Sequence, residues 1–354
     1  MYDPRQDLLT RFQSALTRVH GTAVTRAALS HLSGPHALAA LGKAAPAMAM
    51  GARAIASLEL THSFIAAPRG YGDADHLGGH PVPDDSSLAA GAAFAAWLDA
   101  LPHGLPLIAL VSGGASACIE HLKPGHTLEE LAARTRELLA FGVDIAEINA
   151  ERGRWSQLKH GGARVFAGER EVVVWVLSDV PGDDLSVVGS GPFTPVAAKV
   201  LATNGDAARA IGTEHPIQKL AGDAAKQGKL IARLLRGAKS GIWVWGGETT
   251  VSLPATPGRG GRAQHLALAA AMELDGVEGI ALLSAGTDGI DGNSDDAGAL
   301  VDGGTVARMH DEGIDPVDAL ARADSNTALA AAGDLIHTGP TGTNVMDLVI
   351  ARKD

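Results

Sequence analysis

The sequence predicts an α/β fold with a largely parallel sheet, divided into two domains. Short apolar runs alternate along the chain with Gly/Ser turns and helix-like stretches, a pattern typical of parallel strands joined by helices. The chain has 354 residues, which is enough for two domains that each bury a core. Hydrophobic residues make up 46% of it and charged residues 19%, as expected of a folded globular protein.

Each expected strand is an apolar run that ends in a turn of glycine, serine or aspartate. In chain order, these strand, turn and helix segments are residues 36–55, 105–122, 170–186, 240–253 and 279–292, with a closing strand in 343–351. Ligands of parallel α/β sheets bind beyond the carboxyl ends of the strands. We therefore interpret the turns at these ends as parts of one site.

A basic, helix-like segment at residues 224–241 ends in a glycine turn and indicates where one domain gives way to the next. The first domain is expected to span residues 1–235 and the second residues 236–354. The formal charge of -11 argues against general binding of nucleic acid or anionic membranes, but not against a small anionic substrate. The charge is therefore compatible with a small-molecule partner, and neither nucleic acid nor a membrane is expected.

The chain has one cysteine, Cys118, which excludes an internal disulfide framework and a cysteine-rich zinc site. The N-terminal residues 1–21 mix charged and apolar side chains, unlike a secretory signal. No uninterrupted apolar run approaches the length of a membrane span. The expected location is the cytoplasm.

The stretch "SAGTDGIDGNSDDAGALVD" (284–302) holds five aspartates among glycines. A calcium loop, a magnesium or phosphate loop, and a solvated turn could each explain it. Asp291, Asn293 and Asp295 fit the first ligand positions of an EF-hand, but Asp296 and Asp302 stand where glycine and glutamate are required. The preceding segment is also an apolar strand, which favours a strand-end loop that binds magnesium or phosphate.

Several familiar motifs are absent from the sequence: Walker A, G-x-G-x-x-G, G-x-S-x-G and H-E-x-x-H. What remains suits phosphoryl transfer, which uses backbone N–H groups around phosphates, carboxylate-held magnesium, and cations for developing charge. The turn "SGGAS" (112–116) directs N–H groups toward a phosphate, or is only a tight strand–helix turn. Asp179, Asp183 and Asp184 follow another strand and are either metal ligands or helix caps.

Further candidates are cations and a carboxylate at the ends of other elements. Glu248 and Thr249 follow an expected strand within "GGETT". Lys43 follows the first strand, as a charge-neutralising group or a surface lysine. Arg259 and Arg262 stand at an expected helix start, where cations oppose the helix dipole. Anion binding would explain that conflict, and solvated charge is the alternative.

Taken together, these stretches resemble the MOFRL-type glycerate 2-kinases. The resemblance covers most of the chain and is carried by residues 42–49, 80–91, 111–117, 178–192, 246–253, 258–271, 284–302 and 338–350. Two stretches depart from the family pattern: the segment after Pro192 is shortened, and Gly153-Arg154 replaces a Lys-His pair. Relatives of this family also carry the name hydroxypyruvate reductase.

The resemblance implies an N-terminal doubly wound, mostly parallel domain, a smaller C-terminal α/β domain, and an active site in the inter-domain cleft. The reaction it implies is transfer of the γ-phosphoryl group of ATP to the 2-hydroxyl of D-glycerate, with Mg²⁺. The family's motifs associate Lys43 and Arg262 with catalysis. A homodimer is compatible with the resemblance, which does not fix the oligomeric state.

The complete expected site has three groups of residues. The catalytic group is Lys43, Arg262 and Asp179. The nucleotide-binding group is Ser112, Gly113, Gly114, Ser116, Ser190, Asn204, Gly246, Gly247, Glu248 and Thr249. The metal ligands are Asp183 and Asp288, although the roles of metal ligand and proton acceptor are not separated among the three aspartates. The alternatives are an NAD(P)H-dependent hydroxypyruvate reductase and a non-catalytic nucleotide-binding relative.

Overall fold

The computed structural model describes residues 3–140 and 145–354. Its Cα atoms cluster into two compact units. The parallel-sheet unit comprises Val19–Thr203 and Gly342–Val345, and the mixed-sheet unit comprises Met1–Arg18, Asn204–Thr341 and Met346–Asp354. Each unit is described by itself.

The boundaries of the compact units do not coincide with the expected domain boundary near residue 235. That boundary falls in helix α10 (Ala224–Gly237), which belongs wholly to the mixed-sheet unit. A Cβ atom at Gly228 of α10 would overlap the carbonyl oxygen of Leu266 in α11 (Arg262–Leu274), so α10 and α11 pack backbone against backbone. The division into residues 1–235 and 236–354 stays a prediction about sequence domains.

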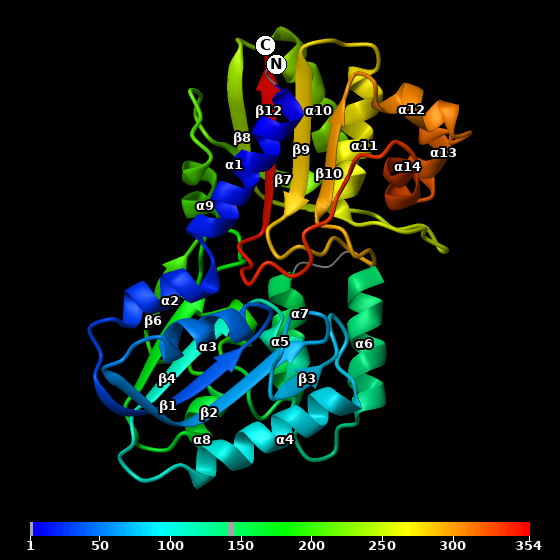
Figure 1. Ribbon diagram of the computed structural model, residues 1–354. Helices are drawn as coiled ribbons and strands as arrows, with labels where there is room; N and C mark the ends of the chain where they lie inside the picture. The colour runs from blue at the N-terminus through cyan, green and yellow to red at the C-terminus, as the bar shows by residue number, and fades with distance from the viewer. Residues whose placement is uncertain (1–2, 141–144) are drawn as a thin grey trace. The chain divides into compact units, whose positions relative to one another are not determined.

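In the parallel-sheet unit, the described residues form a six-stranded sheet of order β3-β2-β1-β4-β5-β6 (Figure 1). All neighbouring strands run parallel. The strands are β1 (Gly34–Leu41), β2 (Leu58–Pro68), β3 (His76–Gly78), β4 (Leu107–Ser112), β5 (Val172–Leu177) and β6 (Ala198–Ala202). This order is that of a doubly wound sheet, which confirms the predicted fold class for this part of the chain.

Helices cover both faces of the parallel sheet, because its central strands are apolar on both sides. Every residue of β4 is buried, and Phe94 of α4 packs against the alternate residues of β1 and β4 that face it. Figure 1 shows α3 and α4 on opposite sides of these strands. The helices are α2 (Gly21–Leu29), α3 (Ala45–Arg53), α4 (Asp85–Ala100), α5 (Ala115–Cys118), α6 (Leu128–Ala140), α7 (Ile145–Trp155) and α8 (Gly162–Phe166), with a 3₁₀ turn η1 (Val188–Ser190).

The mixed-sheet unit contains the second described six-stranded sheet, of order β11-β10-β9-β12-β8-β7. Its strands are β7 (Gln218–Asp223), β8 (Gly241–Thr250), β9 (Ile280–Gly286), β10 (Gly298–Asp302), β11 (Leu335–Ile336) and β12 (Asp347–Lys353). Only the β7–β8 pair is parallel within this described sheet. The largely parallel arrangement expected from the alternation of elements therefore applies to one sheet of the two.

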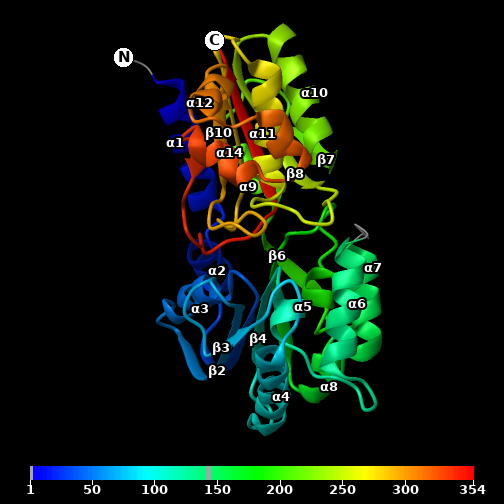
Figure 2. The same ribbon diagram turned by 90° about the vertical axis from the view of Figure 1, so that its right-hand side faces the viewer.

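Helices α10 and α11 (Arg262–Leu274) lie on one face of the mixed sheet and α1 (Pro4–Arg18) lies on the other (Figures 1 and 2). The smaller helices are α9 (Asn204–Ala210), α12 (Thr305–Asp311), α13 (Pro316–Ala321) and α14 (Ser325–Ala331). Arg5 anchors α1 through ion pairs with Asp302 and Asp334. Of the helices in the described residues, none has the length and apolar character needed to cross a membrane.

Candidate functional site

The loops that follow β1, β4 and β5 lie side by side at the carboxyl edge of the parallel sheet. The strand order reverses between β1 and β4, so this edge is the switch point where doubly wound sheets bind ligands. Lys43 follows β1, Gly113 and Gly114 follow β4, and Asp179 follows β5. The Lys43 N–H donates to the Gly113 carbonyl at 2.9 Å, which ties the first two loops together. These predicted residues therefore share one edge.

Two glycines make this close approach of the loops feasible. Gly42 has a φ of +107°, and a Cβ atom there would lie 2.5 Å from the Ser112 Oγ. A Cβ atom at Gly113 would overlap the carboxylate of Asp179 and the side-chain amide of Asn344. Packing alone is therefore a sufficient reason for glycine at both positions, whatever they bind.

Lys43 is half-buried beside other loops of the same edge. Its Nζ lies 5.1 Å from the centroid of the Tyr71 ring, in the loop after β2, within cation–π distance. Its Cγ lies 3.1 Å from the position that a Cβ atom would take at Gly114. The lysine is thus a positioned cation and not a loose surface side chain.

Asp179 accepts a hydrogen bond from the Nδ2 of Asn344 at 2.9 Å. Asn344 lies in the short segment Gly342–Val345, which joins the parallel-sheet unit although it is more than 130 residues away along the chain. This stretch was predicted to be part of a closing strand and to carry part of the family resemblance, but Asn344 was not among the predicted site residues. An asparagine three residues before a buried strand was the signal available.

The three predicted serines use their hydroxyl groups inside the parallel-sheet unit, where all are buried. The Ser112 Oγ accepts from the Ala44 N–H at 3.1 Å and bonds the Leu41 carbonyl at 3.3 Å. The hydroxyls of Ser116 and Ser190 lie 2.8 Å apart. These contacts stabilise the loops, so contact with a nucleotide stays a prediction for these serines.

The carboxylates of Asp183 and Asp184, in the acidic turn after β5, do not converge on one site. Asp183 is exposed and has a left-handed φ of +54°. Asp184 accepts from the N–H and the hydroxyl of Ser186, at 3.0 and 2.6 Å, and these bonds hold the pKa of Asp184 below its usual value. Asp184 therefore caps a turn, while the 3₁₀ turn that follows begins after Val187.

A second group of predicted residues lies at one edge of the mixed sheet. Strand β12 runs antiparallel to both β8 and β9, so its first residue, Asp347, lies opposite Gly247 and Gly286 near their carboxyl ends. Arg262, the first residue of α11, donates from its Nε to the Asp347 carboxylate at 2.6 Å. Its Nη1 lies 2.5 Å from the Glu248 carboxylate. The arginine at a helix start is thus explained by two acidic partners.

These partners also determine the charge state of Arg262. Burial lowers the pKa of the guanidinium, but the carboxylates of Asp347 and Glu248 outweigh burial and raise that pKa above its ordinary value. The side chain remains 37% exposed. Arg262 is therefore a permanently charged group that is held in place and can still be reached by a ligand.

Asp291 explains how α11 tolerates a cation at its start. Its carboxylate accepts from the N–H groups of Ala263 and Gln264 at 3.1 and 2.8 Å, so it caps the helix from a distant loop. Burial raises the pKa of Asp291 to about 7, and the nearby Asp347 charge adds to this effect. Both Asp291 and Asp347 are almost fully buried.

The acidic loop 284–302 divides its aspartates between structure and a candidate site. Asp288 is buried, and its Oδ1 accepts from the Ile290 N–H at 3.2 Å. The Oδ1 atoms of Asp288 and Asp347 lie 3.2 and 3.5 Å from the position of a Cβ atom at Gly286, so the two carboxylates converge there. The other predicted metal ligand, Asp183, belongs to the parallel-sheet unit.

The residues that would form an EF-hand calcium loop make other contacts instead. Asp291 caps α11, and the Asn293 side chain accepts from the Gly260 N–H at 2.8 Å. Asp295 is 91% exposed, with Arg259 4.0 Å away. Within the described part of the chain, no group of three or more His, Cys, Asp or Glu side chains is arranged to hold a metal ion.

The "GGETT" stretch lies inside β8 and not after it, which corrects the sequence prediction. Thr249 is opposite Gly222 of β7, and β8 continues to Thr250. A Cβ atom at Gly246 would overlap the Asn204 side chain, whose Nδ2 donates to the Asp347 carbonyl at 3.0 Å. A Cβ atom at Gly247 would overlap the backbone of β7. Both glycines are thus required by strand packing.

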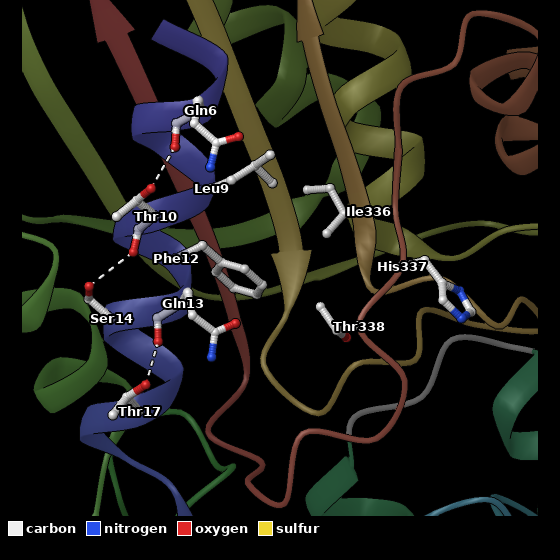
Figure 3. A pocket seen from close by; sticks show the side chains of 10 residues that line it. All are labelled: Gln6, Leu9, Thr10, Phe12, Gln13, Ser14, Thr17, Ile336, His337 and Thr338. Carbon is white, nitrogen blue, oxygen red and sulfur yellow. Dashed lines mark hydrogen bonds between the residues drawn. The ribbon is translucent and has the colours of Figure 1, made fainter. Parts of the chain in front are cut away.

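A groove of about 620 Å³ lies beside α1 in the mixed-sheet unit (Figure 3). Its lining includes Gln6, Leu9 and Phe12 of α1 and the segment 336–338. The hydroxyls of the α1 residues Thr10, Ser14 and Thr17 bond backbone carbonyls one turn earlier and so are already used. Every residue selected from the sequence lies elsewhere.

Comparison with known proteins gives the family. The MOFRL family model matches residues 241–347, and the model described as a domain of unknown function, DUF4147, matches residues 7–226. A D-glycerate 2-kinase of Thermotoga maritima is 36% identical, with 88% of this chain and 89% of that protein covered. The chain belongs to the MOFRL-type glycerate 2-kinase family. The resemblance stated from the sequence is confirmed.

Two further comparisons describe the range of this family. A crystal structure of the Thermotoga maritima glycerate kinase matches with a TM-score of 0.84 and 30% identity, covering 99% of each chain. A protein of Agrobacterium vitis is 38% identical over 76% of this chain and 85% of its own length. Its name, given provisionally, is that of a hydroxypyruvate reductase. Members of the glycerate 2-kinase family therefore carry two different activity names.

Proposed function

We propose that this chain is a kinase that transfers the γ-phosphoryl group of ATP to the 2-hydroxyl of D-glycerate, with Mg²⁺, and releases 2-phosphoglycerate and ADP. The observation that carries this proposal is the 36% identity to a D-glycerate 2-kinase over nearly the whole of both chains. The loops at the carboxyl edge of the parallel sheet support it, because they combine backbone N–H groups with a positioned lysine.

In this proposal the nucleotide phosphates bind at the switch point of the parallel sheet. The loop of Gly113 and Gly114 offers backbone next to Lys43, whose ammonium neutralises charge on the transferring group. Ser112, Ser116 and Ser190 hold the loops in shape through their hydroxyls. Asp179 is the candidate acceptor of the proton from the substrate hydroxyl, oriented by its hydrogen bond from Asn344.

Arg262 has the second charge-neutralising role in the proposal. Its two carboxylate partners, Asp347 and Glu248, fix the guanidinium and keep it charged, which suits a group that acts on a developing anion. Gly246, Gly247 and Asn204 support this arrangement by the close packing of β8, and Thr249, buried opposite Gly222 of β7, is part of the same strand.

The residues present fit a magnesium ion bound together with its nucleotide. Mg²⁺ commonly takes one or two carboxylates and the substrate's phosphate oxygens, so a cluster of three acidic side chains is not required. Asp288 offers a buried carboxylate that converges with that of Asp347, and Asp183 offers an exposed one. When bound, the ion would supply positive charge to the phosphate oxygens.

The test is product analysis. The protein is mixed with ATP, Mg²⁺ and D-glycerate, and ADP, 2-phosphoglycerate and 3-phosphoglycerate are resolved. Formation of 2-phosphoglycerate in step with ADP supports the proposal. ADP without a phosphoglycerate, or no ADP at all, contradicts it.

The second candidate is the NAD(P)H-dependent reduction of hydroxypyruvate, which the name of the Agrobacterium vitis relative suggests. The strand order is compatible with dinucleotide binding, but the turn after β1 reads "GKAAP" in place of the glycine fingerprint. Oxidation of NADH on addition of hydroxypyruvate would favour it. ATP binding without turnover of any hydroxy acid would favour a non-catalytic relative.

A further inference from the structure

The exposed imidazole of His80 is carried by a backbone that is anchored on both sides. The N–H of Gly79, before it, donates to the hydroxyl of Ser87 at 2.9 Å. The carbonyl of Pro81, after it, accepts from the Nη2 of Arg152 at 2.6 Å. Ser87 is fully buried and Arg152 is 5% exposed, whereas His80 is exposed. The loop is therefore fixed while its His80 side chain remains exposed.

His80 lies against the same glycine as Lys43. The Cδ2 of the imidazole is 3.4 Å from the position of a Cβ atom at Gly114, and the Cγ of Lys43 is 3.1 Å from it. Gly114 has a φ of +84° and is the N-cap residue of α5, in the turn that follows β4. The imidazole and the lysine side chain therefore flank one turn, at the switch point of the sheet.

The anchor of His80 is costly, which indicates that the position of the loop matters. Arg152 is buried, and its Nε lacks a hydrogen-bond partner. Burial lowers the pKa of its guanidinium, and the negative charge of Glu120 partly opposes that effect. Glu120 already forms a buried ion pair with Lys159. Within the described part of the chain, Arg152 thus shares this carboxylate with Lys159, and a guanidinium that is removed from water in this way destabilises the fold. Arg152 thus serves as a positioning residue for the His80 loop.

We propose that His80 binds anionic oxygen atoms beside Lys43, as a second side-chain group of the switch-point site. The ligand is a phosphate of the nucleotide or the carboxylate of the hydroxy acid, which present the same chemistry to an imidazole N–H. The assignment of these two ligands rests on the proposed function.

The test replaces His80 with Ala and uses His62→Ala as the matched control. His62 is also exposed, but it lies within β2 opposite Ala37, in the amino-terminal half of β1. Steady-state kinetics gives the KM values for ATP and D-glycerate. Calorimetry gives the dissociation constants for ATP and tripolyphosphate. We expect His80→Ala to weaken one ligand by about tenfold or more, since a hydrogen bond to a charged group contributes at that scale.

The two ligand sources give different results. Weaker binding of ATP and tripolyphosphate assigns His80 to the phosphates, while a higher KM for D-glycerate alone assigns it to the carboxylate. Changes below about twofold for every probe, or equal changes in His62→Ala, overturn the inference. If the wild-type protein makes no 2-phosphoglycerate, the proposed function fails, and the calorimetric arm still decides on His80: unchanged or absent binding in both proteins overturns the inference.

The positioning role of Arg152 is tested with Arg152→Met and with Ser87→Ala, which loosens the other anchor. Each is expected to weaken the same ligand as His80→Ala, and the Arg152→Met and His80→Ala effects should not add in the double variant. Thermal unfolding shows whether each variant folds. A lower Tm with unchanged ligand affinity in both anchor variants would overturn the positioning role.

Discussion

The two sheets of this protein present opposite chemistry at their candidate edges. The parallel sheet ends in glycines, backbone N–H groups and the cation Lys43, with Asp179 as a neighbouring carboxylate. The mixed sheet ends in the carboxylates of Glu248, Asp288 and Asp347, and two of these, Glu248 and Asp347, form ion pairs with the cation Arg262. In the parallel sheet, the loops that follow neighbouring strands meet at one edge. In the mixed sheet, β12 is antiparallel, so its first residue, Asp347, lies between the carboxyl ends of β8 and β9. The direction of the strands therefore decides which residues meet at each edge.

The largest expected effect concerns the cation of the mixed sheet. Replacing Arg262 by Ala should lower kcat for 2-phosphoglycerate formation by about 10³-fold or more, the scale of an arginine that stabilises phosphoryl transfer. It should also lower Tm, because Asp347 is 3% exposed and would lose its ion pair with Arg262. The measurement is steady-state kinetics together with thermal unfolding.

Two comparisons sharpen this result. Arg259→Ala removes a nearby cation that is 59% exposed, and it should leave kcat nearly unchanged. Arg262→Ala combined with Asp347→Asn should recover part of the Tm, since the buried charge is gone, but none of the activity. A fall of less than about tenfold in Arg262→Ala would remove the arginine from a transition-state role.

The second effect tests the parallel-sheet edge. A Cβ atom at Gly113 would overlap the Asp179 carboxylate, so Gly113→Ala must displace Asp179 or its loop. We expect kcat to fall by about 10²-fold, the cost of misplacing catalytic groups by roughly 1 Å. Gly237→Ala, where a Cβ atom meets no neighbour, is the control. Activity close to wild type in Gly113→Ala would mean that Asp179 is not needed where it lies.

Much of the fold could be predicted from the sequence. The runs that became β1, β4 and β5 are apolar because parallel strands are buried on both faces, and this pattern is visible locally. Lys43, Gly113 and Asp179 follow those strands, so their common edge could also be predicted. The prediction that "GGETT" follows a strand was wrong. This stretch extends β8 because it pairs with β7, a strand about 25 residues earlier that no local pattern reveals.

The partners of the candidate residues could not be predicted. Arg262 is paired with Asp347, 85 residues later, and Asp179 with Asn344, 165 residues later. Neither pair leaves a local pattern, since both depend on the antiparallel course of β12 and on the short segment that precedes it. Arg262 consequently looked like an unexplained cation at a helix start.

A smaller effect concerns the pH dependence of stability in the mixed-sheet unit. The pKa of Asp291 is raised to about 7 in the folded protein, first by burial and then by the charge of Asp347. The folded state therefore binds this proton more tightly than the unfolded state, and stability is lost as pH rises toward and through 7.

Asp291→Asn should remove this pH dependence while keeping an oxygen that can accept from the N-terminus of α11. Between pH 5 and pH 8, the wild-type free energy of unfolding should fall by about 2 kcal/mol more than that of the variant. Chemical denaturation at the two pH values measures it. Equal losses in both proteins would show that another group dominates.

The smallest effect returns to Lys43. Its Nζ lies 5.1 Å from the centroid of the Tyr71 ring, and a cation–π contact of this kind contributes about 0.5–1 kcal/mol at a partly exposed site. Tyr71→Leu removes the ring and should raise the KM for ATP about two- to fivefold. Tyr71→Phe keeps the ring and should change the KM less. If Phe and Leu raise it equally, the hydroxyl and not the ring holds the lysine at the parallel-sheet edge.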